Sequence, residues 1–366
     1  MRLKRRATRW SFIPLMFALA LVLAACGGDD APVDEPADEP DVEEPAAEEP
    51  ADETAAVEIS GDVEMARATW DTEYFLAEIY YQLLTELGYD VTHPENNELG
   101  AELFYQALDQ GDLDLWANGW FPLHDPFFEE TTNAVKVGTM IPAGGFNGYL
   151  IDKATADEYD ITSFEQIAEN PELNALFDFD GDGRADLVGC DAGWGCFEAI
   201  EQHLADTSYD ETVNHLSAQY SVLMTDLLAR YERGESVFFY TWTPNWTVGA
   251  LVPGEDVVWL EAPSHPHGNE PIDGVVGCAG DLDPCHTGWN ADDIQVVANA
   301  DFLAANPAAA ALFEAVEIPL ADSADQNLRM QDGEDSLADV ARHAQEWIDG
   351  NRPLVDEWLD AAQAAA

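Results

Sequence analysis

The stretch Val237-Phe238-Phe239-Tyr240-Thr241-Trp242 is an almost unbroken run of apolar and aromatic side chains. Such a run predicts a strand with both faces covered, as in a sheet flanked by helices. The residues before it, 215–231, are predicted to form a longer helix that ends at Gly234. Helix and strand continue to alternate on both sides, which predicts an α/β fold with ligands bound beyond the carboxyl ends of strands.

The same alternation extends over the rest of the folded region. An apolar residue recurs every four positions from Phe75 to Leu87, before Gly88, which indicates a helix and its end. Ser163 followed by Gln166 is a capping box for another helix. Further helices are expected over residues 99–108 and from 307 onward, and strands over residues 89–91, 112–120, 257–260 and 294–298.

Charge and size limit what the protein can do. The 366 residues include 73 acidic and 14 basic ones, which gives a formal net charge of −59. A surface this negative repels nucleic acids and anionic lipid head groups, so nucleic-acid binding is excluded as a function. Apolar residues make up 47% of the chain, with 11 Trp, 16 Phe and 11 Tyr, which suffices for a sizeable core, and the length predicts two domains or one bilobal unit.

The N-terminus has the pattern of a bacterial export signal. Residues 1–26 comprise a basic start, an apolar run too short for a membrane-spanning helix, and Leu23-Ala24-Ala25-Cys26, which resembles a lipobox. The resemblance implies cleavage before Cys26 and a lipid anchor on its thiol, outside the cytoplasm. The alternative is an ordinary signal peptide with an incidental cysteine. Residues 27–56 hold 13 acidic residues, five prolines and no basic residue, which predicts a disordered tether.

The remaining cysteines fit an exported protein. The chain contains four beyond Cys26, and four cysteines allow three pairings. The two close spacings favour Cys190 with Cys196 and Cys278 with Cys285. A zinc site is the alternative, but the chain lacks the CxxC spacing typical of one, so disulfides are predicted.

Three segments, residues 120–125, 189–196 and 240–246, each carry a tryptophan near the end of a predicted strand or loop. A single Trp is usually part of a core. Three of them beside Pro and Gly residues predict an aromatic cage. Such a cage suits a quaternary ammonium group, which has no N–H to donate and spreads its charge over methyl groups that indole faces attract. Stacking on sugar rings is the alternative use.

The middle segment adds a second half-site. Glycines on both sides of Trp194 allow the backbone to approach a ligand closely. A disulfide between Cys190 and Cys196 would fix the direction of the Gly195 and Cys196 amide N–H groups. If Cys196 opens the helix expected to run to about residue 205, these groups are also helix-start donors, which attract a carboxylate. The alternative is a structural loop clip.

The sequence resembles the periplasmic glycine betaine-binding proteins of proline/betaine ABC uptake systems, from about residue 60 to 362. The matching segments, in order, are residues 120–125, 148–153, 178–186, 193–196, 240–244, 256–260, 306–310 and 331–333. The resemblance implies a two-lobed fold of the periplasmic binding-protein kind with a ligand cleft between the lobes. One lobe is expected to comprise residues 57–142 and 299–366, and the other residues 143–298.

The resemblance also implies site residues. The ammonium cage falls on Trp120, Trp194 and Trp242. The carboxylate falls on His124 and the amides of Gly195 and Cys196, and the family's disulfide falls on Cys190 and Cys196. The chain departs from the pattern at Phe121, where a small polar residue is expected, and over residues 263–288, which align poorly. Trp70, Trp116 and Trp246 are further candidates for the cage, although packing is the commoner role.

Two other groups could bind a metal. Asp178, Asp180, Asp182 and Asp186 resemble the first half of a calcium loop, although Gly189 stands where the final Glu of such a loop belongs. A plain Asp/Gly turn is the alternative. His265, His267 and His286 lack helical spacing, so a surface loop is expected there. No cofactor is predicted to be required, and structural calcium is left open.

These observations predict a non-enzymatic receptor, monomeric, that captures glycine betaine or a related osmolyte and delivers it to an ABC permease in the membrane. The hydrolase motifs G-x-S-x-G and H-E-x-x-H do not occur in the chain. A choline or carnitine receptor and a carbohydrate-binding lipoprotein are the alternatives. Betaine is expected to bind more tightly than choline, because choline has no carboxylate for His124 and the two amides.

Overall fold

The computed structural model describes residues 58–266, 268 and 271–366. The signal segment, the lipidation site Cys26 and the tether over residues 27–56 lie outside the described residues, as does His267, so the predictions for them stay predictions. In the described ranges, no helix combines the length and the apolar character that crossing a membrane requires.

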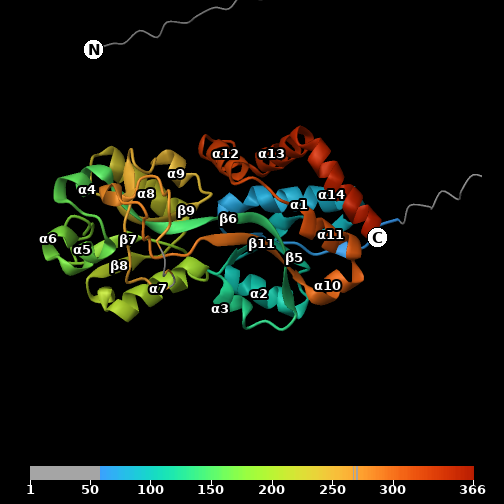
Figure 1. Ribbon diagram of the computed structural model, residues 1–366, viewed down its shortest axis with the longest axis horizontal. Helices are drawn as coiled ribbons and strands as arrows, with labels where there is room; N and C mark the ends of the chain where they lie inside the picture. The colour runs from blue at the N-terminus through green and yellow to red at the C-terminus, as the bar shows by residue number, and fades with distance from the viewer. Residues whose placement is uncertain (1–57, 267, 269–270) are drawn as a thin grey trace, which may run out of the picture. The chain divides into compact units, whose positions relative to one another are not determined.

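One long strand organises the fold. β6 (Ala134–Asp152) pairs along its first part with β11 (Asp292–Asn299) and, from Phe146 onward, with β9 (Phe238–Thr243), antiparallel in both cases. The order in the main sheet is β5-β11-β6-β9-β7-β8, with β10 also on β6. Figure 1 shows β6 and β11 running from one half of the molecule into the other. The α/β class with two lobes is confirmed.

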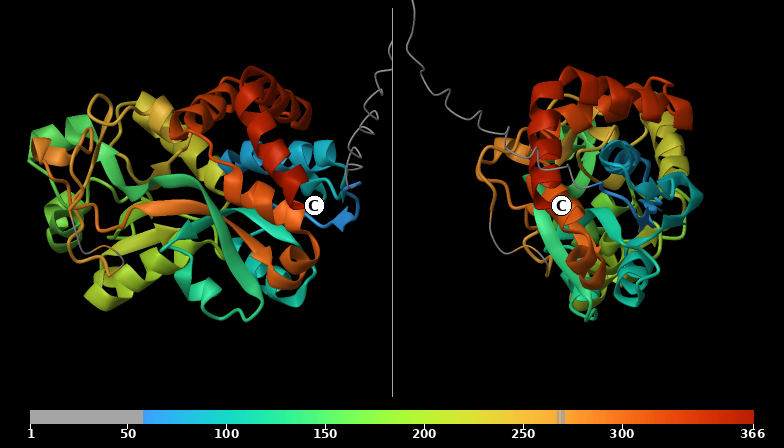
Figure 2. Two further views of the ribbon diagram at one scale, coloured as in Figure 1. Left: turned by 45° about the vertical axis from the view of Figure 1, so that its right-hand side comes forward. Right: turned by 90° about the vertical axis from the view of Figure 1, so that its right-hand side faces the viewer.

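The first lobe surrounds the β5–β11–β6 part of the sheet. Its C-terminal helices cover α1: α13 packs on α1, and α14 packs on α11, as Figure 2 shows from two sides. The elements of this lobe besides β6 and β11 are β1 (Asp62–Val63), β2 (Arg67–Ala68), α1 (Tyr74–Leu87), β3 (Asp90–Val91), β4 (Glu98–Leu99), α2 (Ala101–Gln110), β5 (Leu115–Phe121), α3 (Asp125–Phe128), α10 (Ala300–Ala305), α11 (Pro307–Ala315), α12 (Leu320–Gln331), α13 (Leu337–Gly350) and α14 (Arg352–Ala365).

The second lobe is built around β9. This strand is the predicted apolar run, and its residues from Phe238 to Trp242 are buried, because helices cover both faces. β7 runs parallel to both β9 and β8. The elements are α4 (Lys153–Tyr159), α5 (Phe164–Glu169), α6 (Pro171–Asn174), β7 (Ala185–Val188), α7 (Gly195–Thr207), β8 (Val213–Leu216), α8 (Tyr220–Glu232), α9 (Thr247–Ala250) and β10 (Val257–Trp259).

Local signals in the sequence explain several of these boundaries. α1 ends at Gly88, which adopts φ 112° and donates its N–H to the carbonyls of Leu84 and Thr85. α5 begins with the predicted capping box: the Ser163 hydroxyl accepts from the Gln166 N–H, and the Gln166 side chain accepts from the Ser163 N–H. Both predictions are confirmed.

Two predictions differ from the structure. The predicted helix over residues 215–231 begins only at Tyr220, because His215 belongs to β8 and pairs with Leu187 of β7. β6 is the second difference, because no strand is predicted over residues 134–152. Gly145 is required there: a Cβ on it would lie 2.6 Å from the Trp120 ring.

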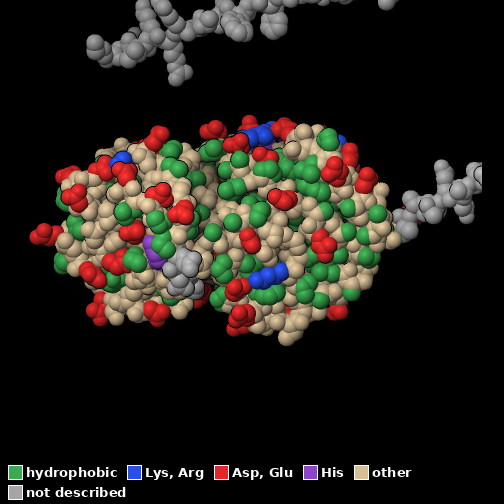
Figure 3. All heavy atoms as spheres, viewed as in Figure 1, with side chains coloured by type: hydrophobic (Ala, Val, Ile, Leu, Met, Phe, Trp, Pro, Cys, Tyr) green, Lys and Arg blue, Asp and Glu red, His purple; other side chains and the backbone are tan. Residues whose placement is uncertain are grey.

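The lobe boundaries stay a prediction. Residues 293–298 of β11 pair with β5 of the first lobe. This pairing favours a return of the chain to the first lobe before Asp292, whereas the predicted boundary lies at residue 298. Acidic side chains are spread over both lobes on the face that Figure 3 shows, with few basic ones between them. The excess of acidic over basic residues in the sequence is therefore also present on this face of the folded protein.

Candidate ligand-binding site

A cavity lies between the lobes. The end of β5, the end of β9 and the start of α7 border this cavity. Trp120 and Trp242 are the last residues but one of β5 and β9, and Trp194 is the residue before α7. The residues that line the cavity are Trp70, Trp120, Leu123, His124, Asn147, Trp194, Gly195, Cys196, Tyr240 and Trp242. All six predicted ligand-binding residues therefore border one space.

The indole rings form most of the cavity wall. The Trp194 and Trp242 centroids lie 5.8 Å apart with their planes at 83°, so one ring presents its edge to the face of the other. Each of Trp120, Trp194 and Trp242 is at most 5% exposed. The side-chain oxygen of Asn118 accepts the Trp120 N–H at 2.7 Å and the Trp70 N–H at 2.9 Å, which fixes two rings with one group.

Trp70 is a wall residue that the sequence left among packing candidates. Its ring centroid lies 5.1 Å from that of Trp194 at 74°, and it lines the cavity. Trp116 and Trp246 do not line it. Trp116 is fully buried and stacks on Phe104 at 4.2 Å, so its role is packing. Trp70 lies outside the three Trp segments, so no pattern in the sequence marks it as a cavity residue.

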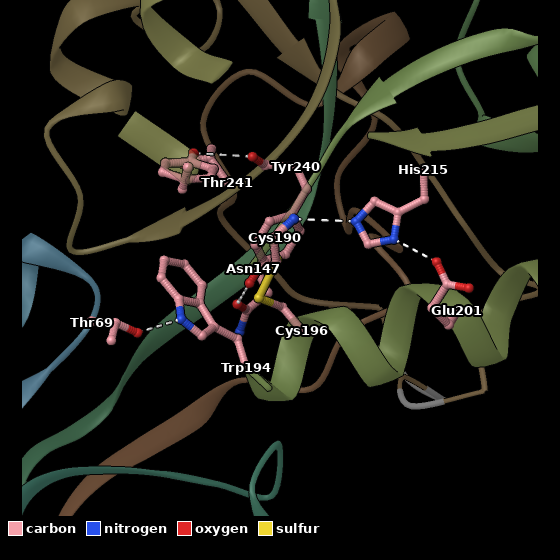
Figure 4. The surroundings of a disulfide bond; sticks show 10 residues. Thr69, Asn147, Cys190, Trp194, Cys196, Glu201, His215, Tyr240 and Thr241 are labelled. Carbon is pink, nitrogen blue, oxygen red and sulfur yellow. Dashed lines mark hydrogen bonds and ion pairs between the residues drawn. A yellow bond between two sulfur atoms is a disulfide. The ribbon is translucent and has the colours of Figure 1, made fainter. Parts of the chain in front are cut away.

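Trp194 also joins the lobes. Its indole N–H donates to the Thr69 hydroxyl at 2.7 Å, from the second lobe to the first (Figure 4). The Glu102 N–H reaches the Gly193 carbonyl at 3.4 Å across the same boundary. A residue of the cavity wall is thus part of the contact that holds the two lobes over the cavity.

His124 is held in one tautomer. Its Nδ1 accepts the backbone N–H of Trp120 at 3.1 Å and lies 3.3 Å from the Tyr105 hydroxyl. The ring is 2% exposed, and burial lowers the pKa of His124 to about 3, with a smaller effect from the charge of Lys136. The ring is therefore neutral with its proton on Nε2, the nitrogen on the side of Gly195.

The start of α7 faces this histidine. A Cβ on Gly195 would lie 2.8 Å from His124 Cδ2 and 3.1 Å from Leu123 Cγ, so only glycine allows the close approach. Within the described residues, the Gly195 and Cys196 N–H groups meet no backbone acceptor. α7 spans 13 residues, and the positive end of its dipole adds to these two donors. The geometry suits an anionic group.

The disulfide pairings are those that the spacings favour, Cys190 with Cys196 and Cys278 with Cys285. Figure 4 shows how the first bridge is held. The Cys190 N–H donates to Nε2 of His215 at 3.2 Å, so Nδ1 of His215 carries a proton and donates to Glu201 at 2.7 Å. Glu201 belongs to α7, and the loop and the helix are thereby linked on the side away from Trp194.

The region over residues 263–288 corrects one prediction. His265 does not lie on the surface: it is 2% exposed and packs against Trp289, with ring centroids 4.2 Å apart. The core residues Tyr149 and His203 also contact it, which the local sequence gave no sign of. His286 is partly exposed.

The aspartate loop forms a compact turn. Asp178, Asp180 and Asp186 each bring one carboxylate oxygen within 4.8 Å of the others, the one such group in the described ranges. Asp182 instead forms an ion pair with Arg184 at 2.8 Å. The Asp178 carboxylate accepts the backbone N–H groups of Gly181, Asp182 and Gly183, at 2.7, 3.1 and 2.9 Å. Calcium binding by the loop stays a prediction.

Two lobes joined by crossing strands, with a cavity between them lined by indole rings and the start of a helix, define a solute-binding protein of the two-lobed class. Residues 61–350 match the family described as the substrate binding domain of ABC-type glycine betaine transport systems, and the chain belongs to this family.

Curated relatives agree with this assignment. The chain is 40% identical over 309 residues to the glycine betaine-binding periplasmic protein OusX of Dickeya dadantii (strain 3937), covering 83% of this chain and 90% of the relative. It is 38% identical over 307 residues to the glycine betaine/proline betaine-binding periplasmic protein of Escherichia coli (strain K12), with the same coverage.

Solved structures share the fold. Lactococcal OpuAC, in its closed-liganded conformation with glycine betaine, matches with a TM-score of 0.63 at 17% identity, over 82% of this chain and 99% of that chain. A choline-binding protein of an ABC transporter, in complex with choline, matches with a TM-score of 0.62 at 15% identity, over 82% and 96% of the two chains.

Proposed function

We propose that this protein captures glycine betaine outside the cytoplasm and delivers it, as a monomer, to an ABC permease. A lipid on Cys26 would hold it at the membrane, and no cofactor is required. The observation that carries the proposal is that four indole rings line the same cavity as three hydrogen-bond donors, the His124 ring and the amides of Gly195 and Cys196. The periplasmic location of the curated relatives supports the extracytoplasmic site.

The trimethylammonium group would occupy the aromatic end. The indole rings there are almost fully buried, and the attraction between a cation and an aromatic face grows when water is removed, to about 2 kcal/mol or more. Three of the four indole N–H groups are already bonded within the protein, two to Asn118 and one to Thr69. The walls are thus left with few donors, which suits methyl groups better than sugar hydroxyls.

The carboxylate would occupy the opposite end. There it would accept the Gly195 and Cys196 N–H groups and the Nε2–H of His124. Hydrogen bonds to a charged acceptor are worth about 1.5–3 kcal/mol each in protein sites. Choline would satisfy the aromatic end alone and leave these donors without a partner. A zwitterion also has no net charge, so the strongly negative protein neither attracts nor repels it at long range.

Ligand would favour the closed arrangement of the lobes. Trp120 and His124 come from the first lobe, and Trp194 and Gly195 from the second. A ligand that contacts all four binds the closed form better than the open one and shifts the population toward it. A closed and loaded form is the state that a permease can distinguish from an empty one.

Isothermal titration calorimetry tests the proposal. The purified protein is titrated with glycine betaine, choline, carnitine and a neutral disaccharide. We expect one betaine per chain, tighter binding of betaine than of choline, and betaine recovered unchanged. Tighter binding of choline would contradict the carboxylate site, and binding of the disaccharide without betaine would favour the carbohydrate-binding alternative.

A further inference from the structure

A buried carboxylate stands behind the cavity, outside its lining. Asp292 is the first residue of β11, at the crossing between the lobes, and is 2% exposed. Its Oδ1 accepts the backbone N–H of Leu123 at 2.8 Å, and its Oδ2 accepts the side-chain amide of Asn147 at 2.9 Å. Asn147 Oδ1 in turn accepts the hydroxyl of Tyr240.

The chain of hydrogen bonds has one direction. Burial raises the pKa of Asp292 to about 7, while its bonds to the two N–H donors favour the ionised form. In its ionised form the Asp292 carboxylate only accepts, as its bonds from the Leu123 N–H and the Asn147 NH₂ group require, which leaves the Asn147 carbonyl oxygen for Tyr240. Burial raises the pKa of the Tyr240 hydroxyl well above its ordinary value, so the hydroxyl keeps the proton that it donates. Asp292 therefore sets the orientation of both side chains.

The residues at the two ends of this network, Leu123 and Tyr240, both line the cavity. Leu123 precedes His124 and lies beside Gly195 at the anion-binding end. Tyr240 lines the aromatic end, with its ring centroid 5.9 Å from that of Trp242. Leu123 belongs to the first lobe and Tyr240 to the second, so the connection spans the boundary between them.

We propose that Asp292 is a positioning residue for ligand binding, which holds the anion-binding loop and the aromatic wall in register across the two lobes. The inference rests on the proposed function. The substitution Asp292→Asn removes an acceptor, so the NH₂ group of the introduced amide faces the NH₂ group of Asn147. If Asn147 turns over to avoid this, the Tyr240 hydroxyl loses its acceptor, and one buried group is unpaired in either arrangement.

A swap of the two side chains supplies the sharpest test. In the double variant Asp292→Asn with Asn147→Asp, residue 292 can accept from Leu123 and donate to residue 147, whose carboxylate can accept from Tyr240. Every hydrogen bond and the net charge are retained. Asp293→Asn is the matched control, because Asp293 accepts the Ala143 N–H at 2.7 Å from the same strand but is more exposed.

The readout is the betaine Kd by calorimetry, with thermal unfolding as a check on folding. We expect Asp292→Asn to weaken betaine binding about tenfold or more, the double variant to recover to within about threefold of the wild type, and Asp293→Asn to stay within about twofold. Wild-type affinity in Asp292→Asn, or no recovery in a folded double variant, would overturn the inference. A wild-type protein that binds no betaine would instead overturn the proposed function.

Discussion

The backbone N–H of Trp120 donates to Nδ1 of His124 at 3.1 Å, so a cage residue determines which nitrogen of the histidine carries the proton. The same five-residue turn is closed by the His124 N–H, which donates to the Trp120 carbonyl at 2.7 Å. The strand end that presents the indole therefore also aims the Nε2–H. In the proposed site, this coupling would let one short segment serve both ends of a zwitterion.

His124→Ala should weaken betaine binding by about 1.5–3 kcal/mol, or roughly 10- to 150-fold, because it removes a donor to the carboxylate. Choline should bind the variant as it binds the wild type, because choline has no group at that position. Calorimetry with both ligands on the same preparation is the measurement. An equal loss for both would mean that the histidine acts through packing.

Gly195→Ala should reduce betaine affinity at least tenfold, because a Cβ at 2.8 Å from the His124 ring forces the ring and the start of α7 apart. Gly350→Ala is the control, since a Cβ there meets nothing within 4 Å. It should leave affinity unchanged. Full betaine binding by Gly195→Ala would show that the helix start is not in contact with the ligand.

Trp70→Phe should weaken betaine by about 1 kcal/mol, roughly fivefold, because phenylalanine attracts a cation less and leaves Asn118 with one fewer donor. Trp358→Phe is the matched substitution of a buried indole on α14, outside the cavity lining, and should leave the Kd unchanged. A Kd that does not respond to Trp70→Phe would assign this ring to packing alone.

Stability should depend on pH through Glu73. This side chain is fully buried at the start of α1, and burial raises the pKa of Glu73 from 4.5 to about 8, although the Ala68 N–H bonds it. The folded state therefore binds a proton that the unfolded state releases. The stabilisation from this proton is lost as pH rises from 4.5 to 8, by roughly 1.4 kcal/mol per pH unit.

Glu73→Gln measures this contribution. Urea unfolding at pH 5.5 and pH 7.5 should show the wild type losing stability relative to the variant by about 2 kcal/mol or more between the two conditions. Glu357→Gln, on the exposed side of α14, is the control for loss of one charge and should show a much smaller difference. If the difference in unfolding free energy between Glu73→Gln and the wild type were the same at both pH values, the buried carboxyl would not be protonated as proposed.

Calcium can be tested on the aspartate loop. If the loop binds the ion, millimolar calcium should raise the unfolding temperature of the wild type, and Asp180→Asn should abolish the rise, because it removes one ligand of the trio. Asp182→Asn should keep the rise, since Asp182 pairs with Arg184. If calcium does not change the unfolding temperature of the wild type, the loop is a hydrogen-bonded turn that does not bind the ion.

The elements that sequence predicts best are those with local causes. Gly88 ends α1 through its own backbone conformation, and Ser163 and Gln166 cap α5 within three residues of each other. The three indoles predicted to form a cage, which line one cavity, have a similar local signal, because each lies in a short segment with Pro or Gly beside it. The resemblance to a family then brought those segments together, which spacing along the chain alone does not.

What the sequence missed depends on contacts between distant residues. His215 enters a strand because β7 and Glu201 hold it, while its own neighbours favour a helix. Asp292 and Asn147 are 145 positions apart, and neither stands in a motif. Gly145 looks like a strand breaker until the Trp120 ring that needs its space is known. Such roles arise only from tertiary packing.

The strand order has a consequence for how the chain reaches its native form. β11 lies between β5 and β6, although about 140 residues separate it from β6 in the chain. As the chain emerges from its N-terminal end, the strands of the second lobe up to β10 are therefore present while the facing edges of β5 and β6 still await the strand between them. Unpaired edges invite aggregation. The late arrival of residues 292–299 makes the first lobe, which contains the early strands β1 to β5, the last to finish folding.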